Sequence, residues 1–234
     1  MKRSIYEEPL KIELVDDVIF VNGTQHPRDI RTYEQMRDVA REELLEKGEL
    51  YYMYRDIYKK DNIRFDITVI PQKKLGIEYA KTHGHYHPKN EEGVEYAEIY
   101  QILQGKAMFI LQKRNNNDTV DVIIIDAKEK DIVLIPPGYG HVSINKGEET
   151  LVLSNLVYDK FTSVYGDYKT NKGAAYYYVE EHEIVQNTNY LVNKNERFSP
   201  EQMNKKFGVG FTDLLSEFIA EPSKFEFLKR PEML

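Results

Sequence analysis

Three histidines alternate along one short stretch of the chain, at His83, His85 and His87. If this stretch is extended, successive side chains point to opposite faces, so His85 and His87 project to one side. Two imidazoles can then approach a single metal ion, and the chain supplies further ligands. Glu98 lies in a second strand-like segment, and His141 follows a tight Pro-Gly turn. We therefore predict a site of three imidazoles and one carboxylate, with room for water or substrate.

Other carboxylates near Glu98 could supply the oxygen ligand instead. A His-x-His pair alone is most often a surface accident, so the prediction depends on the two later ligands. The segment after His87 also carries three other carboxylates, Glu91, Glu92 and Glu95. Alternation favours Glu98, because it shares a strand face with Tyr100. His83 shares the face of the other two histidines, but we expect strand twist to carry it away from the metal.

The composition narrows the class of protein. The 234 residues carry 32 basic and 39 acidic side chains, with no long basic run, which argues against nucleic acid as a partner. No apolar run is long enough to span a bilayer, and residues 1–8 lack the apolar region of a signal peptide. Cysteine is absent, which excludes disulfides and thiol catalysis. We expect a cytoplasmic protein with neither nucleic acid nor membrane as partner.

The elements that must position the ligands are mostly strands. From Glu49 to Asp159, short β-branched and aromatic segments follow one another, separated by glycine, proline and polar turns. Strands this short, without helices between them, are typical of an antiparallel barrel or a jelly roll.

Two capping boxes predict helices outside this region. Thr32 and Gln35 precede apolar residues at helical spacing, which predicts one amphipathic helix over about 33–47. Ser199 and Gln202 begin a short helix, and a second helix is expected between about Thr212 and Ala220.

The domain boundary is expected in a polar, Asn-rich segment over 186–198. We predict a catalytic β domain over residues 1–186 and a C-terminal helical extension over residues 187–234. The sequence leaves open whether the extension docks on the same barrel or on a second subunit.

The central motifs resemble those of the cupin superfamily, and in particular the cupin-type (archaeal-type) glucose-6-phosphate isomerases. The likeness covers roughly residues 8–180 and rests on three segments, Lys81–His87, Ala97–Lys106 and Pro136–Asn145. The resemblance implies a mainly β fold, a cupin jelly-roll barrel with an N-terminal-region helix and short C-terminal helices.

The same resemblance implies a homodimeric enzyme that interconverts glucose 6-phosphate and fructose 6-phosphate, a step of glycolysis and gluconeogenesis. The metal ligands would be His85, His87, Glu98 and His141. They would hold one divalent ion per subunit, Fe²⁺ in the first place, with Mn²⁺, Zn²⁺ and Ni²⁺ as alternatives. The implied substrate-binding residues are Tyr51, Thr68, Thr82, Gly84, Tyr158 and Tyr165. A family histidine just before the position of Tyr165 has no counterpart, because Ser163 and Val164 stand there.

Glu98 and Tyr100 are the candidate catalytic residues. Aldose–ketose isomerisation moves a proton between C2 and C1 through an enediolate, so it needs a base and positive charge near the developing oxyanion. We expect Glu98 to act as the base or Tyr100 to relay the proton; a hydride shift is the alternative.

The sequence shows no obvious clamp for a phosphate group. Hydroxyl groups of Thr82, Tyr158 and Tyr165 and amides around Gly84 would have to suffice, aided by Lys81. Each tyrosine taken alone is better explained as a sheet residue, and only the group of tyrosines supports a binding role. Two other functions stay open: a different metal-dependent cupin enzyme, such as another sugar isomerase or an oxygenase, and a non-catalytic sugar-binding cupin.

Overall fold

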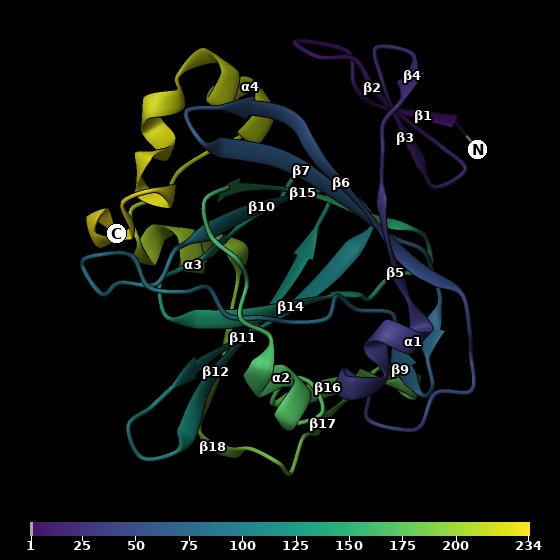
Figure 1. Ribbon diagram of the computed structural model, residues 1–234, viewed down its shortest axis with the longest axis vertical. Coiled ribbons are helices and arrows are strands. Elements are labelled where there is room, and N and C mark those ends of the chain that lie inside the picture. The colour runs from purple at the N-terminus through teal and green to yellow at the C-terminus, as the bar shows by residue number, and fades with distance from the viewer. Residues whose placement is uncertain (1) are drawn as a thin grey trace.

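The computed structural model describes residues 2–234 as a β-barrel in which two larger sheets face each other (Figure 1). The first sheet has the order β13-β10-β15-β7-β6-β5 and is antiparallel throughout. Its strands are β5 (Asp29–Thr32), β6 (Glu49–Lys60), β7 (Ile63–Ile70), β10 (Glu98–Gln104), β13 (Ile132–Ile135) and β15 (Leu151–Tyr158). Consecutive strands of the chain are distributed between the two sheets, which is the arrangement of a jelly roll. The predicted cupin-type jelly-roll fold is confirmed.

The second sheet has the order β14-β11-β12-β18. Its strands are β11 (Lys106–Arg114), β12 (Thr119–Lys128), β14 (Tyr139–Asn145) and β18 (Leu191–Phe198). Two small sheets complete the β structure. One contains β1 (Lys2–Tyr6), β2 (Ile12–Val15), β3 (Val18–Val21) and β4 (Thr24–Gln25), and the other β8 (Lys74–Leu75), β9 (Glu78–Tyr79), β16 (Tyr176–Val179) and β17 (Glu183–Gln186).

The helices are short. The α-helices are α1 (Tyr33–Met36), α2 (Gly166–Thr170), α3 (Pro200–Lys206) and α4 (Leu214–Ala220). Short 3₁₀ helices cover Arg37–Val39, Glu180–His182, Pro222–Leu228 and Pro231–Met233. Among residues 2–234, no helix has the length and apolar character needed to cross a bilayer.

The prediction of a helix over 33–47 is wrong beyond Val39. The capping box of Thr32 and Gln35 is present, but α1 ends at Met36 and a 3₁₀ turn follows. Residues 40–48 form no helix, because the hairpin formed by β8 and β9 takes up hydrogen-bonding groups of these residues. The Arg41 amide donates to Glu78 Oε1 (2.8 Å), and Glu46 Oε1 accepts from the amide of Gly76 (3.2 Å).

The C-terminal segment is not wholly helical. Helices α3 and α4 lie where the sequence predicts them, but β18 precedes them and extends the second sheet by pairing in parallel with β12. The segment docks on the barrel of its own chain. Asn204 of α3 bonds the backbone of the edge strand β13 at Leu134 (3.1 Å), and the Leu214 amide donates to Gln101 on β10 (2.9 Å).

Alternation along β7 shows how the first sheet serves both core and site. Phe65, Ile67 and Val69 are fully buried in the apolar cluster on the outer face, together with Phe218 of α4. The intervening residues, Arg64, Asp66 and Thr68, line a pocket on the inner face. Packing of the outer face against α4 therefore fixes which side chains of β7 face the pocket.

Candidate metal centre and active-site pocket

Paired strands of the first sheet bring the inner-face residues into rows. Tyr100 on β10 lies opposite Asn155 on β15, which in turn lies opposite Asp66 on β7. Glu98, two residues before Tyr100, therefore shares the inner face with it, and all four residues line the pocket. The alternation argument that favoured Glu98 in the sequence thus agrees with the register of the sheet.

The histidine segment lies beside the second sheet. The backbones of His85 and His141 bond each other in both directions, at 3.2 and 3.0 Å, so these two residues are direct neighbours. Gly84 adopts a positive φ of 79°, and a Cβ at this position would come within 2.4 Å of the Tyr168 ring. Only glycine combines this backbone conformation with such close packing.

The four predicted ligands converge. One ligand atom from each of His85, His87, Glu98 and His141, called here the His/Glu cluster, lies within 4.8 Å of the others. The Nε2 atoms of His85 and His87 are 3.1 Å apart. Glu98 Oε2 is 3.3 Å from Nε2 of both His87 and His141. The other three carboxylates that competed for this position, Glu91, Glu92 and Glu95, are not part of the cluster.

The donor atoms fit a divalent cation. Glu98 Oε2 is buried and accepts no hydrogen bond from any residue between 2 and 234. Burying an unpartnered carboxylate oxygen is costly, and a cation bound between the imidazoles would remove that cost. Three imidazole nitrogens and one carboxylate oxygen are ligands of Zn²⁺, Fe²⁺, Mn²⁺ and Ni²⁺ sites.

Neighbouring groups hold two of these ligands in orientation. His87 Nδ1 lies 2.9 Å from the Tyr96 carbonyl oxygen, which fixes Nδ1 as the donor and leaves the Nε2 lone pair for the cluster. Asn155 Nδ2 donates to Glu98 Oε1 at 2.7 Å, so the other oxygen, Oε2, faces the imidazoles. Hydrogen bonds of this kind are what orient the ligands of metal sites.

Burial and mutual contact shift the protonation of the site. Burial lowers the pKa of His85 well below its ordinary value, and the nearby His141 and His87 add to the effect. Burial opposes ionisation of Glu98, but His141 and His87 outweigh it and hold the pKa of this carboxyl well below its usual range. Burial, followed by the negative charge of Glu98, raises the pKa of Tyr100 well above that of a free phenol. The site therefore presents an ionised carboxylate, neutral imidazoles at His85 and His141, and a neutral phenol.

Most of the predicted substrate-binding residues lie around one pocket next to the cluster. Those that line it are Tyr51, Thr68, Thr82, Tyr158 and Tyr165, together with Tyr100. Gly84 is not a lining residue, and its closest contact is the Tyr168 ring. The expected aid from Lys81 is wrong, because its ammonium group forms a buried ion pair with Glu78 and does not line the pocket.

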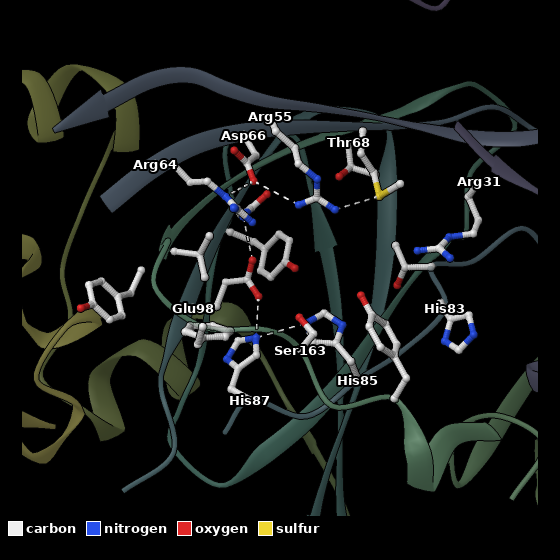
Figure 2. A pocket seen from close by; sticks show the side chains of 18 of the residues that line it. Arg31, Arg55, Arg64, Asp66, Thr68, His83, His85, His87, Glu98 and Ser163 are labelled. Atoms are coloured by element: carbon white, nitrogen blue, oxygen red, sulfur yellow. Dashed lines mark hydrogen bonds and ion pairs between the residues drawn. The ribbon is translucent and has the colours of Figure 1, made fainter. Parts of the chain in front are cut away.

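Sequence reasoning missed three arginines and one aspartate of the pocket. Figure 2 shows Arg55, Arg64 and Asp66 above the cluster, and Arg31 on the far side beside His83. Asp66 Oδ2 accepts from Arg64 Nε (2.8 Å) and lies 3.7 Å from Arg55, which also bonds Asp29 (2.9 Å). A signal existed for two of them, because Arg64 and Asp66 alternate with Thr68 on one strand. No local signal pointed to Arg31. It lies beside Tyr51 only because β5 pairs with β6, and this pairing is not visible in the sequence.

A jelly-roll barrel with this cluster on its inner surface defines the chain as a cupin with a candidate metal centre. The sequence model of the glucose-6-phosphate isomerase (GPI) family matches residues 35–195, well over half of the chain. The chain belongs to this family, and the predicted resemblance is confirmed.

Curated relatives agree with the family match. Glucose-6-phosphate isomerase of Thermococcus litoralis is 26% identical over 160 residues, which is 64% of this chain and 79% of the relative. The enzyme of Pyrococcus furiosus is 27% identical over 63% of this chain and 78% of its own. The enzyme of Thermococcus kodakarensis is 27% identical over 75% of this chain and 92% of its own. Among solved structures, an oxalate decarboxylase aligns with a TM-score of 0.37 at 20% identity, covering 53% of this chain and 29% of that one.

Proposed function

We propose that this protein is a metal-dependent isomerase that interconverts glucose 6-phosphate and fructose 6-phosphate through an enediolate. The observation that carries the proposal is the His/Glu cluster beside a pocket lined by hydroxyl and guanidinium groups, in a chain that belongs to the GPI family. The names of the relatives support the same reaction.

The cluster residues would hold one divalent ion per subunit, with Fe²⁺ proposed first and Mn²⁺, Zn²⁺ and Ni²⁺ as alternatives. When bound, such an ion supplies Lewis-acid polarisation of a sugar oxygen and positive charge opposite a developing oxyanion.

The chain's own residues bind the sugar and handle its protons. Glu98 is ionised and Tyr100 is a neutral phenol, so the first can accept a proton and the second can donate one. They lie on the same strand face, two residues apart, and both line the pocket. Hydroxyl groups of Thr68, Thr82 and Tyr51 are proposed to bind the remainder of the sugar phosphate.

The test is a coupled assay on fructose 6-phosphate before and after chelation, with Mn²⁺ or Fe²⁺ then restored. Activity that chelator abolishes and metal restores supports the proposal. Metal binding without turnover of fructose 6-phosphate, but with turnover of a free sugar, would instead support a different cupin isomerase. Metal bound without turnover of any sugar would leave an oxygenase or a sugar-binding cupin as the alternatives.

The route of the hydrogen is tested separately. An enediolate route predicts that deuterium from solvent enters the product at C1 or C2 during turnover, because the abstracted proton exchanges. Complete absence of exchange would indicate a hydride shift.

A homodimer in the cytoplasm, acting in glycolysis and gluconeogenesis, stays part of this proposal. Light scattering on the purified protein measures the mass in solution, and a mass of one subunit would contradict the dimer.

A further inference from the structure

Arg31 enters the pocket from the edge of the first sheet. It lies directly opposite Tyr51 in the pairing of β5 with β6, and paired residues of neighbouring strands project to the same face. Both residues line the pocket. Figure 2 shows the Arg31 guanidinium beside His83, on the side of the pocket opposite Glu98 and His87.

Arg31 has no anionic partner among residues 2–234, unlike the other two arginines of the pocket. Arg55 and Arg64 share Asp66, and Arg55 also bonds Asp29. Glu34 and Asp38 line an adjoining hollow with Arg31, but neither forms an ion pair with it, and Asp38 pairs with Lys169 instead.

Part of the guanidinium is also buried without a partner. Arg31 Nε is inaccessible to solvent and donates to no described residue. A buried donor on a charged group is costly when it is left unpaired. An arginine kept in this state is suited to a ligand that brings its own negative charge, and the planar guanidinium matches phosphate oxygens with two parallel hydrogen bonds.

Two hydroxyl groups that line the pocket with Arg31 are arranged as donors. Tyr51 OH accepts a hydrogen bond from the His83 amide (3.2 Å), and Thr82 Oγ1 accepts one from the Ser143 amide (2.9 Å). Each hydroxyl oxygen is therefore already an acceptor, and its own proton stays available to a ligand. A cation and two hydroxyl donors on one side of the pocket favour an anion with several acceptor oxygens.

We propose that Arg31 binds the phosphate group of the sugar phosphate and sets the preference for phosphorylated over free sugars. This inference rests on the proposed function and deepens it. The family model begins its match at residue 35, so Arg31 lies outside the matched region. The binding residue is thus contributed by the chain segment that precedes the family match.

The experiment compares Arg31→Gln and Arg31→Lys with a matched control, Arg28→Gln. Arg28 is close in sequence but does not line the pocket. Its guanidinium carbon lies 4.0 Å from the centroid of the Tyr52 ring, and its Nη2 lies 3.6 Å from Glu49 Oε2. On metal-loaded protein, kcat and KM for fructose 6-phosphate and calorimetric binding of inorganic phosphate are measured.

We expect Arg31→Gln to raise KM and the Kd for inorganic phosphate at least about tenfold, while kcat changes less than about threefold. Arg31→Lys should retain part of the phosphate affinity, and Arg28→Gln should behave as wild type. An unchanged KM together with an unchanged phosphate Kd would overturn the inference, as would a loss confined to kcat.

The two proposals fail separately. If the wild-type protein does not isomerise fructose 6-phosphate, the proposed function fails, and phosphate calorimetry still decides the role of Arg31. If Arg31→Gln does not fold, the lysine variant decides, because it keeps the charge but loses the bidentate geometry. Phosphate binding by Arg31→Lys equal to that of wild type would then contradict the inference.

Discussion

His141 and Glu98 come from different sheets of the barrel, β14 and β10, so the cluster exists only when the two sheets pack together. At the scale of single residues, each member of the cluster would therefore contribute to a metal site through its position as well as its chemistry. His83 is two residues from His85, but it is absent from the cluster. Its ring packs edge-on against the Tyr165 ring, with the ring centroids 5.0 Å apart.

This contrast gives a prediction for metal content. We expect His141→Ala to weaken metal affinity by more than about 100-fold, because loss of a ligand exceeds the 10- to 100-fold cost of losing a group that orients one. His83→Ala is the matched control and should keep its metal. Metal analysis after dialysis is the measurement, and equal metal in His141→Ala and wild type would reject the ligand set.

At the scale of elements, the turn that carries the histidines depends on Gly84. We expect Gly84→Ala to destabilise the fold by about 2 kcal/mol or more, because φ is positive and the new methyl group would meet the Tyr168 ring. Gly166→Ala is the control, since a Cβ there has no atom within 4 Å. Urea unfolding measures both variants, and an unaltered midpoint for Gly84→Ala would contradict the packing argument.

The end of β15 is tied to β6 by an ion pair between Asp159 and Lys59. Burial opposes ionisation of Asp159, but Lys59 outweighs it and lowers the pKa of the carboxyl below 3.8. A lowered pKa in the folded state means that the pair contributes stability above the unfolded pKa, and that this contribution is lost as the pH falls through the folded pKa.

We therefore expect Asp159→Asn to cost about 1 kcal/mol at pH 7, a small value because Lys59 is partly exposed, and the difference to shrink below about pH 4. Glu196→Gln, which breaks an exposed pair with Lys194, should cost less than about 0.5 kcal/mol. Thermal unfolding at pH 7 and pH 3 is the measurement. A difference that grows at pH 3 would give the opposite sign and refute the assignment.

At the scale of the whole molecule, the C-terminal segment covers the outer face of the barrel. Phe218 of α4 is fully buried. Its ring packs edge-on against the rings of Tyr58 of β6 and Phe225, with centroid distances of 5.8 and 5.4 Å. Since the opposite face of the same sheet lines the pocket, the segment supports the sheet that carries the site. The proposed division into a domain over 1–186 and an extension over 187–234 can thus be tested by how the chain unfolds.

We expect Phe218→Ala to lower the free energy of unfolding by about 3–5 kcal/mol, with one cooperative transition retained. The control is Leu45→Ala, because Leu45 is 85% exposed and should matter little. Calorimetry is the measurement. A separate low-temperature transition in Phe218→Ala would mean that the extension unfolds independently of the barrel.

Local patterns in the sequence predicted the His/Glu cluster, the capping boxes and the β character of residues 49–159. His85 and His87 alternate on one extended stretch, and Thr32 and Ser199 each form a capping box with a glutamine three residues further on, so each signal lies within a few positions. The period of two along a strand also selected Glu98 over its acidic neighbours, because that period is fixed by backbone geometry.

Only the tertiary structure decided the rest. Residues 40–48 carry helical spacing, but the Arg41 amide bonds to Glu78 and the Glu46 side chain to Gly76, and such non-local partners leave no trace in a local pattern. Arg31 precedes a helix cap and shows no chemistry of its own in the sequence. Its role depends on the register of β5 against β6, which brings it beside Tyr51. Register is set by long-range packing, and packing is what the sequence alone does not display.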